Sequence, residues 1–242
     1  MSALLAVDGI SKRFRGLVAV DRVSFEVPQG AIFAVIGPNG AGKTTLFNMI
    51  AGVFAPEVGA VTFAGERIDG LPPDRICRRG IGRTFQLVRP FPALSVEDNV
   101  TVGALLHRRQ VAHARAHAHE VLRRLDLYDK RAQSASALTL PDRKRLEVAR
   151  ALATDPKLLL LDEVMAGLRP TETDRIVAIL KELNRETGLT ILLIEHVMRA
   201  VMALSQHIVV LHHGEKISEG TPEHVVRDQA VLDCYLGEEV EV

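Results

Sequence analysis

The sequence predicts an α/β fold with an antiparallel β subdomain and an inserted helical lobe. Three observations lead to this prediction. First, a short apolar run passes into a glycine-rich stretch and then into a helical pattern. Second, strand-like apolar runs alternate with an amphipathic helical pattern in the last third of the chain, as in βαβ units. Third, helical patterns fill the region between these two parts, from about residue 93 to 153.

The N-terminal region alternates apolar and polar residues in the manner of strands. Residues 4–30 contain two such stretches, which end at the turn Pro28-Gln29-Gly30. Residues 60–68 form a further strand pair around a turn at Gly65. Short strands with one polar face are typical of antiparallel sheets. We therefore expect an antiparallel sheet beside the core that follows.

The stretch Gly37-Pro38-Asn39-Gly40-Ala41-Gly42-Lys43-Thr44-Thr45 follows the apolar run 31–36 and opens a helical pattern that closes at Gly52. A strand, a glycine-rich turn, Lys-Thr and a helix together form a phosphate-binding P-loop. The glycines let successive backbone N–H groups point inward, and the helix N-terminus adds partial positive charge. We expect Lys43 to lie in an exposed loop and to reach the outer phosphates, and Thr44 to ligate Mg²⁺. The stretch predicts binding of a nucleoside triphosphate.

Three later apolar runs predict buried strands, at 157–163, 190–196 and 207–213, and a helix at 174–188 separates the first two. The first run ends in Asp162 and Glu163. In P-loop ATPases such a strand end places an aspartate on Mg²⁺, opposite the P-loop threonine. The next carboxylate is then positioned to accept a proton from the attacking water. The alternative is a buried strand with an acidic exit, but the P-loop favours the ATPase interpretation.

The helical lobe is predicted from two patterns. The first begins at Ser95, a helix cap followed by an acidic first turn, and the second is the amphipathic segment 141–155. We place the helical lobe at residues 87–155 and the nucleotide-binding α/β lobe at 1–86 and 156–242.

Composition sets modest bounds on function. The 242 residues are 47% hydrophobic, enough for a full core, and 30 basic residues cancel 30 acidic ones. This balance gives no electrostatic reason to expect nucleic acid as a partner. No apolar run approaches the ~20 residues of a membrane span, and the N-terminus lacks the pattern of a signal peptide. Two separate cysteines fit a reducing compartment. We expect a soluble, cytoplasmic chain.

The order of these motifs resembles the ATP-binding subunits of ABC transporters over essentially the whole chain. The stretch 37–45 resembles the Walker A motif of that family, and 158–163 its Walker B motif. Gln86 falls at the position of the Q-loop glutamine, His196 at that of the switch histidine, and Phe14 at that of the aromatic residue that stacks on adenine. Each of these three also has an ordinary alternative, as a solvated loop residue, a strand cap or a core residue.

The resemblance implies an ABC ATPase fold, in which a P-loop ATPase core carries the antiparallel subdomain and the helical lobe. It implies ATP and Mg²⁺ as ligands, with Thr44, Gln86 and Asp162 at the metal. It also implies that Glu163 activates water and that His196 stabilises the leaving γ-phosphate. The implied partners are integral-membrane permease subunits, a second ATPase subunit in a homo- or heterodimer and, indirectly, a solute-binding protein. The implied location is the cytoplasmic face of the plasma membrane.

Within the family, three stretches resemble importer subunits for branched-chain and other apolar amino acids. They are 83–100, 166–170 and 230–238. The chain lacks a longer insertion that one of two paired subunits often carries, so the resemblance leaves open which of the pair it matches. Two other functions also remain open, a soluble non-transport ABC ATPase and a regulatory subunit that hydrolyses ATP weakly.

The chain departs from the family at the signature segment. The family has Leu-Ser-Gly-Gly-Gln, which contacts the γ-phosphate bound by the partner subunit, where this chain has Leu138–Asp142. Thr139 keeps a hydroxyl for this contact, but Pro141 has no N–H, and we expect Asp142 to bring negative charge toward the partner's anion. Val164-Met165 also replaces the usual proline and small residue after Walker B. These changes predict a weakened contact to a partner's ATP and, therefore, work mainly in a heterodimer.

Two further features have competing interpretations. A histidine-rich helical stretch could bind a metal, but a solvated helix is the simpler interpretation. An apolar loop after Gln86 falls where the family meets its membrane subunit, and ordinary packing of the helical lobe explains it nearly as well. The residues are His113, His117, His119 and Glu120 in the first and Leu87, Val88, Phe91 and Leu94 in the second.

Overall fold

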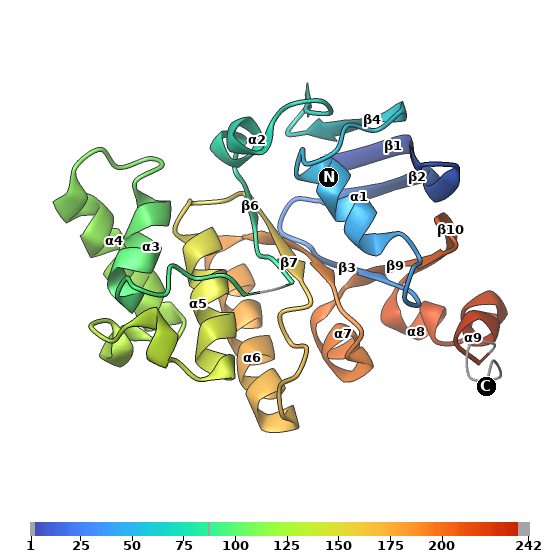
Figure 1. The fold of residues 1–242 in the computed structure, drawn as a ribbon. Helices are drawn as coiled ribbons and strands as arrows, with labels where there is room; N and C mark the ends of the chain where they lie inside the picture. The colour runs from blue at the N-terminus through green and yellow to red at the C-terminus, as the bar shows by residue number, and fades with distance from the viewer. Residues whose placement is uncertain (1–2, 87, 237–242) are drawn as a thin grey trace.

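The chain folds into two β-sheets with helices packed around them, as shown by a computed structural model that describes residues 3–86 and 88–236 (Figure 1). The first sheet has four antiparallel strands in the order β2-β1-β4-β5. The second has six strands in the order β10-β9-β3-β8-β7-β6. The first sheet comprises β1 (Ala3–Phe14), β2 (Leu17–Pro28), β4 (Val58–Phe63) and β5 (Glu66–Arg67), and the second β3 (Ile32–Ile36), β6 (Ile81–Arg83), β7 (Leu158–Asp162), β8 (Thr190–Ile194), β9 (His207–His212) and β10 (Glu215–Gly220).

Five strands of the second sheet run parallel, and only the edge strand β10 is antiparallel to its neighbour. The central strands β3, β7 and β8 are buried at every position. Their apolar runs follow from this burial, because helices or the other sheet cover both faces of a parallel sheet. Alternate residues therefore enter two different cores. Leu159 and Leu161 face one core, while Leu158 and Leu160 face the other.

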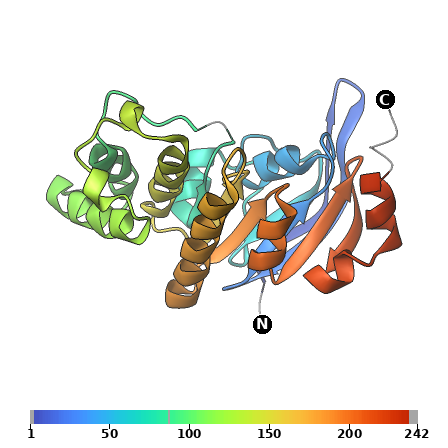
Figure 2. The same ribbon diagram turned by 90° about the horizontal axis from the view of Figure 1, so that it is seen from below.

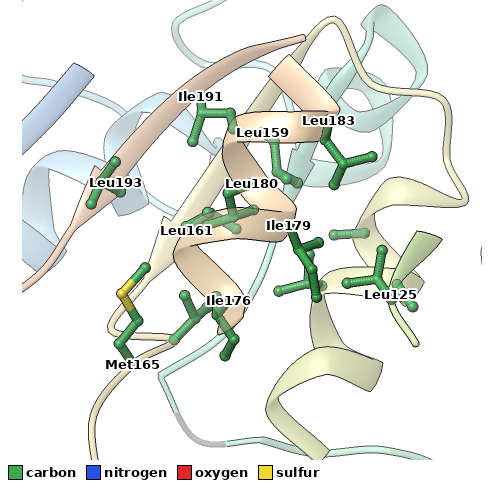
Figure 3. Packing of buried hydrophobic residues seen from close by; sticks show 14 of the residues in the cluster. Leu125, Leu159, Leu161, Met165, Ile176, Ile179, Leu180, Leu183, Ile191 and Leu193 are labelled. Carbon is green, nitrogen blue, oxygen red and sulfur yellow. The ribbon is translucent and has the colours of Figure 1, made fainter. Parts of the chain in front are cut away.

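The helices divide between the two cores. Helix α1 (Lys43–Ile50) packs between the two sheets, in the core that contains Phe47. Helix α6 (Pro170–Thr187) lies over β7 and β8 and buries Ile176, Leu180 and Leu183 against them (Figure 3). The remaining helices are α2 (Pro73–Arg79), α3 (Val96–Ala104), α4 (Val111–Arg124), α5 (Leu140–Leu152), α7 (Met198–Leu204), α8 (Pro222–Val225) and α9 (Gln229–Leu236), with short 3-10 turns η1 (Tyr128–Lys130) and η2 (Ala135–Ala137).

Helices α3, α4 and α5 gather at one side of the molecule, away from the four-stranded sheet, as both views show (Figures 1 and 2). Helix α3 begins where the sequence predicts, because the Ser95 hydroxyl accepts a hydrogen bond from the Asp98 amide at 3.0 Å. Among the residues that the structure describes, no helix combines the length and the apolar character needed to cross a membrane.

The structure confirms the α/β fold and most of the predicted elements. The antiparallel strands, the strand before the glycine-rich stretch and the three later buried strands all form. Among the strands and α-helices of the described residues, six were not predicted from the sequence, namely β6, β10, α2, α7, α8 and α9. Strand β6 has only three residues, one of them glycine, so it carries too little periodic signal to identify.

Candidate functional site

The predicted site residues gather at the carboxyl ends of the parallel strands, where ligands bind in open α/β sheets. Strand β3 leads into the glycine-rich loop, β6 into Gln86, β7 into Glu163 and β8 into His196. A pocket of about 590 Å³ opens beside this edge. Its lining combines the loop with the start of β2 and the turn after β9: Phe14, Leu17, Val18, Ala19, Asn39, Gly40, Ala41, Gly42, Lys43, Thr44, Thr45, Gln86, Glu163 and His213.

The glycines of the loop are required by close backbone contacts. Gly37 has φ +148°, and a Cβ atom there would lie 2.0 Å from the Leu211 carbonyl oxygen. Gly42 has φ +98°, and a Cβ atom would lie 2.2 Å from the Ala19 carbonyl oxygen. Only glycine adopts such conformations without steric penalty. The loop is therefore pressed against β2 and β9, with the N-terminus of α1 beside the pocket.

Lys43 does not lie in an exposed loop, and that expectation is wrong. It is the first residue of α1 and is only 8% exposed. Its ammonium group donates hydrogen bonds to the carbonyl oxygens of Gly37 and Pro38, each at 2.7 Å. The loop curls around the ammonium group because these two carbonyls satisfy its charge. The lysine thus supports the loop as well as charging the pocket.

Asp162 is buried, and only one of its two carboxylate oxygens has a hydrogen-bond partner among the described residues. Its Oδ2 atom accepts a hydrogen bond from Arg83 at 3.2 Å, and Arg83 also donates to Asn48 of α1 at 2.7 Å. Burial raises the pKa of Asp162, and the charge of Arg83 opposes this rise. The Oδ1 atom is buried and has no hydrogen-bond partner within the described residues. A buried carboxylate oxygen without a protein partner fits a role as a ligand to a metal cation.

Glu163 and Gln86 line the pocket, and His196 lies beside Glu163, so the structure brings together three residues that the family resemblance placed at one site. The Gln86 amide donates to Glu163 Oε2 at 2.7 Å, and His196 Nδ1 lies 3.9 Å from Glu163 Oε1. Glu163 has φ +49°, in the left-handed region that side chains other than glycine seldom adopt. Its backbone is therefore fixed in an uncommon conformation directly after Asp162.

Phe14 lies at the rim of the pocket and is not a core residue. The end of β1 places its ring there, 38% exposed, in edge-to-face contact with Phe54 at 5.2 Å between ring centroids. An exposed aromatic face beside a nucleotide pocket can stack on a planar base. The position at the rim is compatible with the expected role.

Two buried charged residues lie behind the pocket. Lys144 of α5 donates to the Glu163 carbonyl oxygen at 2.9 Å, and Glu195 accepts a hydrogen bond from the Met165 amide at 2.8 Å. Burial lowers the pKa of Lys144 and raises the pKa of Glu195 to about 7. Nothing in the sequence distinguishes them from exposed charged residues, so they were not predicted as part of the site.

The signature segment lies outside this pocket, and its side chains satisfy one another. The Thr139 hydroxyl donates to Asp142 Oδ2 at 2.8 Å. Asp142 is buried and also accepts from Lys130 and Arg145. Burial alone would raise the pKa of Asp142, but these hydrogen bonds outweigh it and hold the pKa below its usual value. The expectation that Asp142 presents its charge outward is therefore wrong, because two cations draw it inward.

The structure bears on the competing interpretations of the histidine-rich helix and of the apolar loop. His117 pairs with Asp155 and His119 with Glu97, so these histidines have different acidic partners. In the apolar loop, Phe91 and Leu94 are exposed, while Leu87 lies outside the described residues. The sequence also missed Arg83, whose contact with Asp162 joins residues 79 positions apart.

Comparison with known proteins agrees with this geometry. Residues 20–166 match the family described as ABC transporter, and residues 215–241 match the family of branched-chain amino acid ATP-binding cassette transporters. The chain belongs to the ABC transporter family of ATP-binding cassettes, and it is an ATPase of that type.

Its relatives include proteins of bacterial amino-acid transport. The chain is 40% identical to the high-affinity branched-chain amino acid transport ATP-binding protein BraF of Pseudomonas aeruginosa, over 97% of this chain and 98% of that protein. It is likewise 40% identical to LivG of Escherichia coli K12, a protein of the same description, with the same coverage. Among solved structures, the ADP conformation of the cassette MJ1267 has 30% identity and a TM-score of 0.89 over 98% of this chain and 100% of that one.

Proposed function

We propose that this chain is the ATP-hydrolysing subunit of an importer for branched-chain or related apolar amino acids, at the cytoplasmic face of the membrane. The supporting observation is identity of 40% along almost the full length of BraF and LivG. The chain is also 34% identical to the lipopolysaccharide export system ATP-binding protein LptB of Escherichia coli K12, which is not described as an amino-acid transport protein. The match of residues 215–241 to the branched-chain amino acid family favours the import function.

The residues at the pocket fit a magnesium ion. Thr44, Gln86 and Asp162 would hold it, since hydroxyl, amide and carboxylate oxygens are the ligands that Mg²⁺ prefers. The buried, unpartnered Oδ1 atom of Asp162 is the observation that supports this assignment. When bound, Mg²⁺ neutralises charge on the phosphates of ATP.

The chain's own residues divide the work of hydrolysis. The loop amides of residues 37–45 and the Lys43 ammonium group bind the phosphates, and Phe14 stacks on the adenine. Glu163 accepts the proton of the attacking water, while Gln86 holds the carboxylate in place through their 2.7 Å hydrogen bond. His196, beside Glu163, stabilises the leaving γ-phosphate.

The proposed partners bind surfaces outside the nucleotide pocket, on the helical lobe and at the signature segment. In this proposal residues 87–155 form the helical lobe, and its exposed Phe91 and Leu94 contact a permease subunit. Thr139 faces the ATP of a second ATPase subunit. We favour a heterodimer, because Thr139 already donates its hydroxyl hydrogen to Asp142 and Pro141 has no N–H. A solute-binding protein would deliver the amino acid to the permeases.

The test is uptake of radiolabelled leucine into membrane vesicles that contain the assembled transporter. We expect ATP-dependent uptake that excess isoleucine or valine suppresses and excess glutamate does not. Glu163→Gln should abolish uptake, whereas Lys181→Met, on the exposed face of α6, should leave it unchanged. ATP hydrolysis without uptake of any apolar amino acid would contradict the proposed substrate and leave the ATPase assignment intact.

A further inference from the structure

Lys144 and Glu195 have no place in the pocket lining, yet both are buried and both bind the loop that carries Glu163. Lys144 is 5% exposed and Glu195 1% exposed. Charged side chains are seldom buried to this extent, because removing them from water is unfavourable unless they make specific polar contacts. Within the described residues, Lys144 donates to the backbone of Glu163, and the Oε1 atom of Glu195 accepts from the backbone of Met165, while its Oε2 atom is buried without a partner.

The loop needs such contacts. Glu163 has φ +49°, and a residue of this type keeps that conformation only where its surroundings hold it. One contact comes from the sheet, because the Glu163 amide donates to the Ile194 carbonyl oxygen at 3.0 Å. That bond fixes the amide group of Glu163. The carbonyl oxygen of Glu163 accepts a longer hydrogen bond from the Ala166 amide, at 3.3 Å, within the loop itself.

Lys144 supplies the shorter contact on the carbonyl side, and the only one of the two that comes from outside the loop. Its ammonium group donates to the Glu163 carbonyl oxygen at 2.9 Å, across from helix α5. The carboxylates of Glu195, Glu163 and Asp162 all favour its charged form. A buried charge is weak evidence for a role in stability, since an apolar residue in its place is often as stable. A fixed hydrogen bond to the backbone of Glu163 is the specific task that an apolar side chain could not perform.

Glu195 supplies the contact at the other end of the loop. Its Oε1 atom accepts the Met165 amide at 2.8 Å. The Met165 side chain is itself anchored in the core with Leu161 and Ile176 (Figure 3). Glu195 is also the neighbour of His196 in the chain, so one short segment fixes the loop and presents the histidine that lies 3.9 Å from Glu163.

We propose that Lys144 and Glu195 are positioning residues that hold Glu163 in its productive conformation through the backbone of the loop 163–165. The proposal rests on the proposed role of Glu163 in hydrolysis. It also links two regions, since Lys144 belongs to the same helix that begins at Leu140 in the signature segment. A shift of α5 would therefore move a hydrogen bond on the backbone of Glu163.

The first test compares Lys144→Met, which removes the donor, with Lys144→Arg, which keeps one, in the full chain within the assembled transporter. We expect Lys144→Met to lower kcat about 10- to 100-fold, since misplacement of a reacting group by about 1 Å can have an effect of this size. The Kd for ATP should change less than about threefold. Lys144→Arg should recover most of the rate, and the exposed control Lys181→Met should behave as wild type.

The second test asks whether Lys144 acts through Glu163. In a Glu163→Gln background, Lys144→Met should cause no further loss of rate, because a residue that acts only by placing a carboxylate has nothing left to place. A further loss of the same size as in wild type would overturn the proposal. Near-normal turnover in Glu163→Gln alone would instead refute the proposed role of Glu163, so the two failures are distinguishable.

The third test uses Glu195 and remains decisive if Lys144→Met does not fold. Glu195→Gln keeps an acceptor oxygen for the Met165 amide and should retain kcat within about threefold, whereas Glu195→Leu should lose it about tenfold or more. Comparable loss in both variants would show that the charge, not the hydrogen bond, matters, and would contradict a positioning role. Activity close to wild type in both variants would contradict it as well.

Discussion

The nucleotide pocket and the signature segment differ in whether their polar groups have hydrogen-bond partners within the protein. Beside the pocket, the Oδ1 atom of Asp162 is buried without a protein partner among the described residues, and Glu163, which lines the pocket, is held in an uncommon conformation. In the signature segment, the Thr139 hydroxyl donates to Asp142, and Lys130 and Arg145 donate to the same carboxylate. The first region leaves polar atoms for a ligand to bind, whereas in the second region the carboxylate of Asp142 already has its partners within the protein. The ability of a polar motif to bind a ligand therefore depends on which of its atoms lack partners within the protein.

The largest effect should come from the pocket. Glu163→Gln should keep ATP binding but lower hydrolysis about 10²- to 10⁴-fold, the usual effect of losing a positioned general base. The amide cannot accept the proton of water, while the phosphate contacts of the loop remain. Phosphate release and nucleotide affinity of the purified variant measure the two quantities. Turnover close to wild type would remove Glu163 from the catalytic role.

A pH series should separate the two regions next, because their carboxyl groups shift in opposite directions. The pKa of Glu195 is raised to about 7, so its ionisation destabilises the folded state as pH rises from about 4.5 through 7. Relative to wild type, Glu195→Gln should gain stability over that range, by up to roughly 3 kcal/mol at pH 8. Urea unfolding at pH 5 and pH 8 measures the difference.

Asp142 provides the matched comparison. Its pKa is lowered, so its contribution to stability is present above about pH 4 and is lost as pH falls through the folded-state pKa. Asp142→Asn should therefore destabilise the chain more at pH 7 than at pH 3. The same direction of pH dependence in both variants would contradict the assignment of opposite shifts.

Lys43→Ala should have a smaller effect on two properties at once. Loss of a charged hydrogen-bond donor to phosphate should weaken ATP binding about 10- to 100-fold, since such bonds contribute about 1.5–3 kcal/mol. Because Lys43 also satisfies the carbonyl groups of Gly37 and Pro38, the melting temperature without nucleotide should fall as well. Differential scanning calorimetry with and without ATP measures both. An unchanged melting temperature would show that the buried contacts are unimportant to folding.

The smallest effect should come from the signature segment. Replacing Leu140 and Pro141 with glycine restores a backbone N–H and should raise ATP turnover of the isolated chain several-fold, up to about tenfold. Asp142 should be left in place in this variant, because Arg145 would lose a buried partner without it. If the native chain already turns over as fast as the variant, the altered signature is functionally silent and the heterodimer proposal loses its main support.

The parts of the fold that the sequence predicts are those with strong local patterns. The buried strands β3, β7 and β8 are runs of apolar residues, and the glycine-rich loop combines its spacing with the strand and helix around it. Membership of Gln86 and Glu163 in one site was expected only through the resemblance to a family, and their direct contact was not expected, because local patterns do not report which strand ends meet.

The parts that the sequence does not predict depend on contacts between distant residues. The inward orientation of Asp142 requires Lys130, which lies in a separate turn, and the burial of Lys43 requires the carbonyl groups of its own loop to curl around it. Charged residues such as Lys144 have no sequence feature that separates a buried position from an exposed one. Only the packing of α5 against the end of β7 reveals the difference.

The hairpin of β9 and β10 gives the pocket a particular place in the order of folding. The Gly214 amide donates to the Ala41 carbonyl oxygen of the glycine-rich loop, and the Gly214 carbonyl oxygen accepts from Asp21. Strand β3, which precedes the loop, has both of its neighbours, β8 and β9, from the last quarter of the chain. During synthesis on the ribosome, the P-loop sequence therefore emerges early, but the strands that contact it emerge late. Nucleotide binding is in this sense a checkpoint for a completed chain, because an unfinished one lacks the strands that hold the loop.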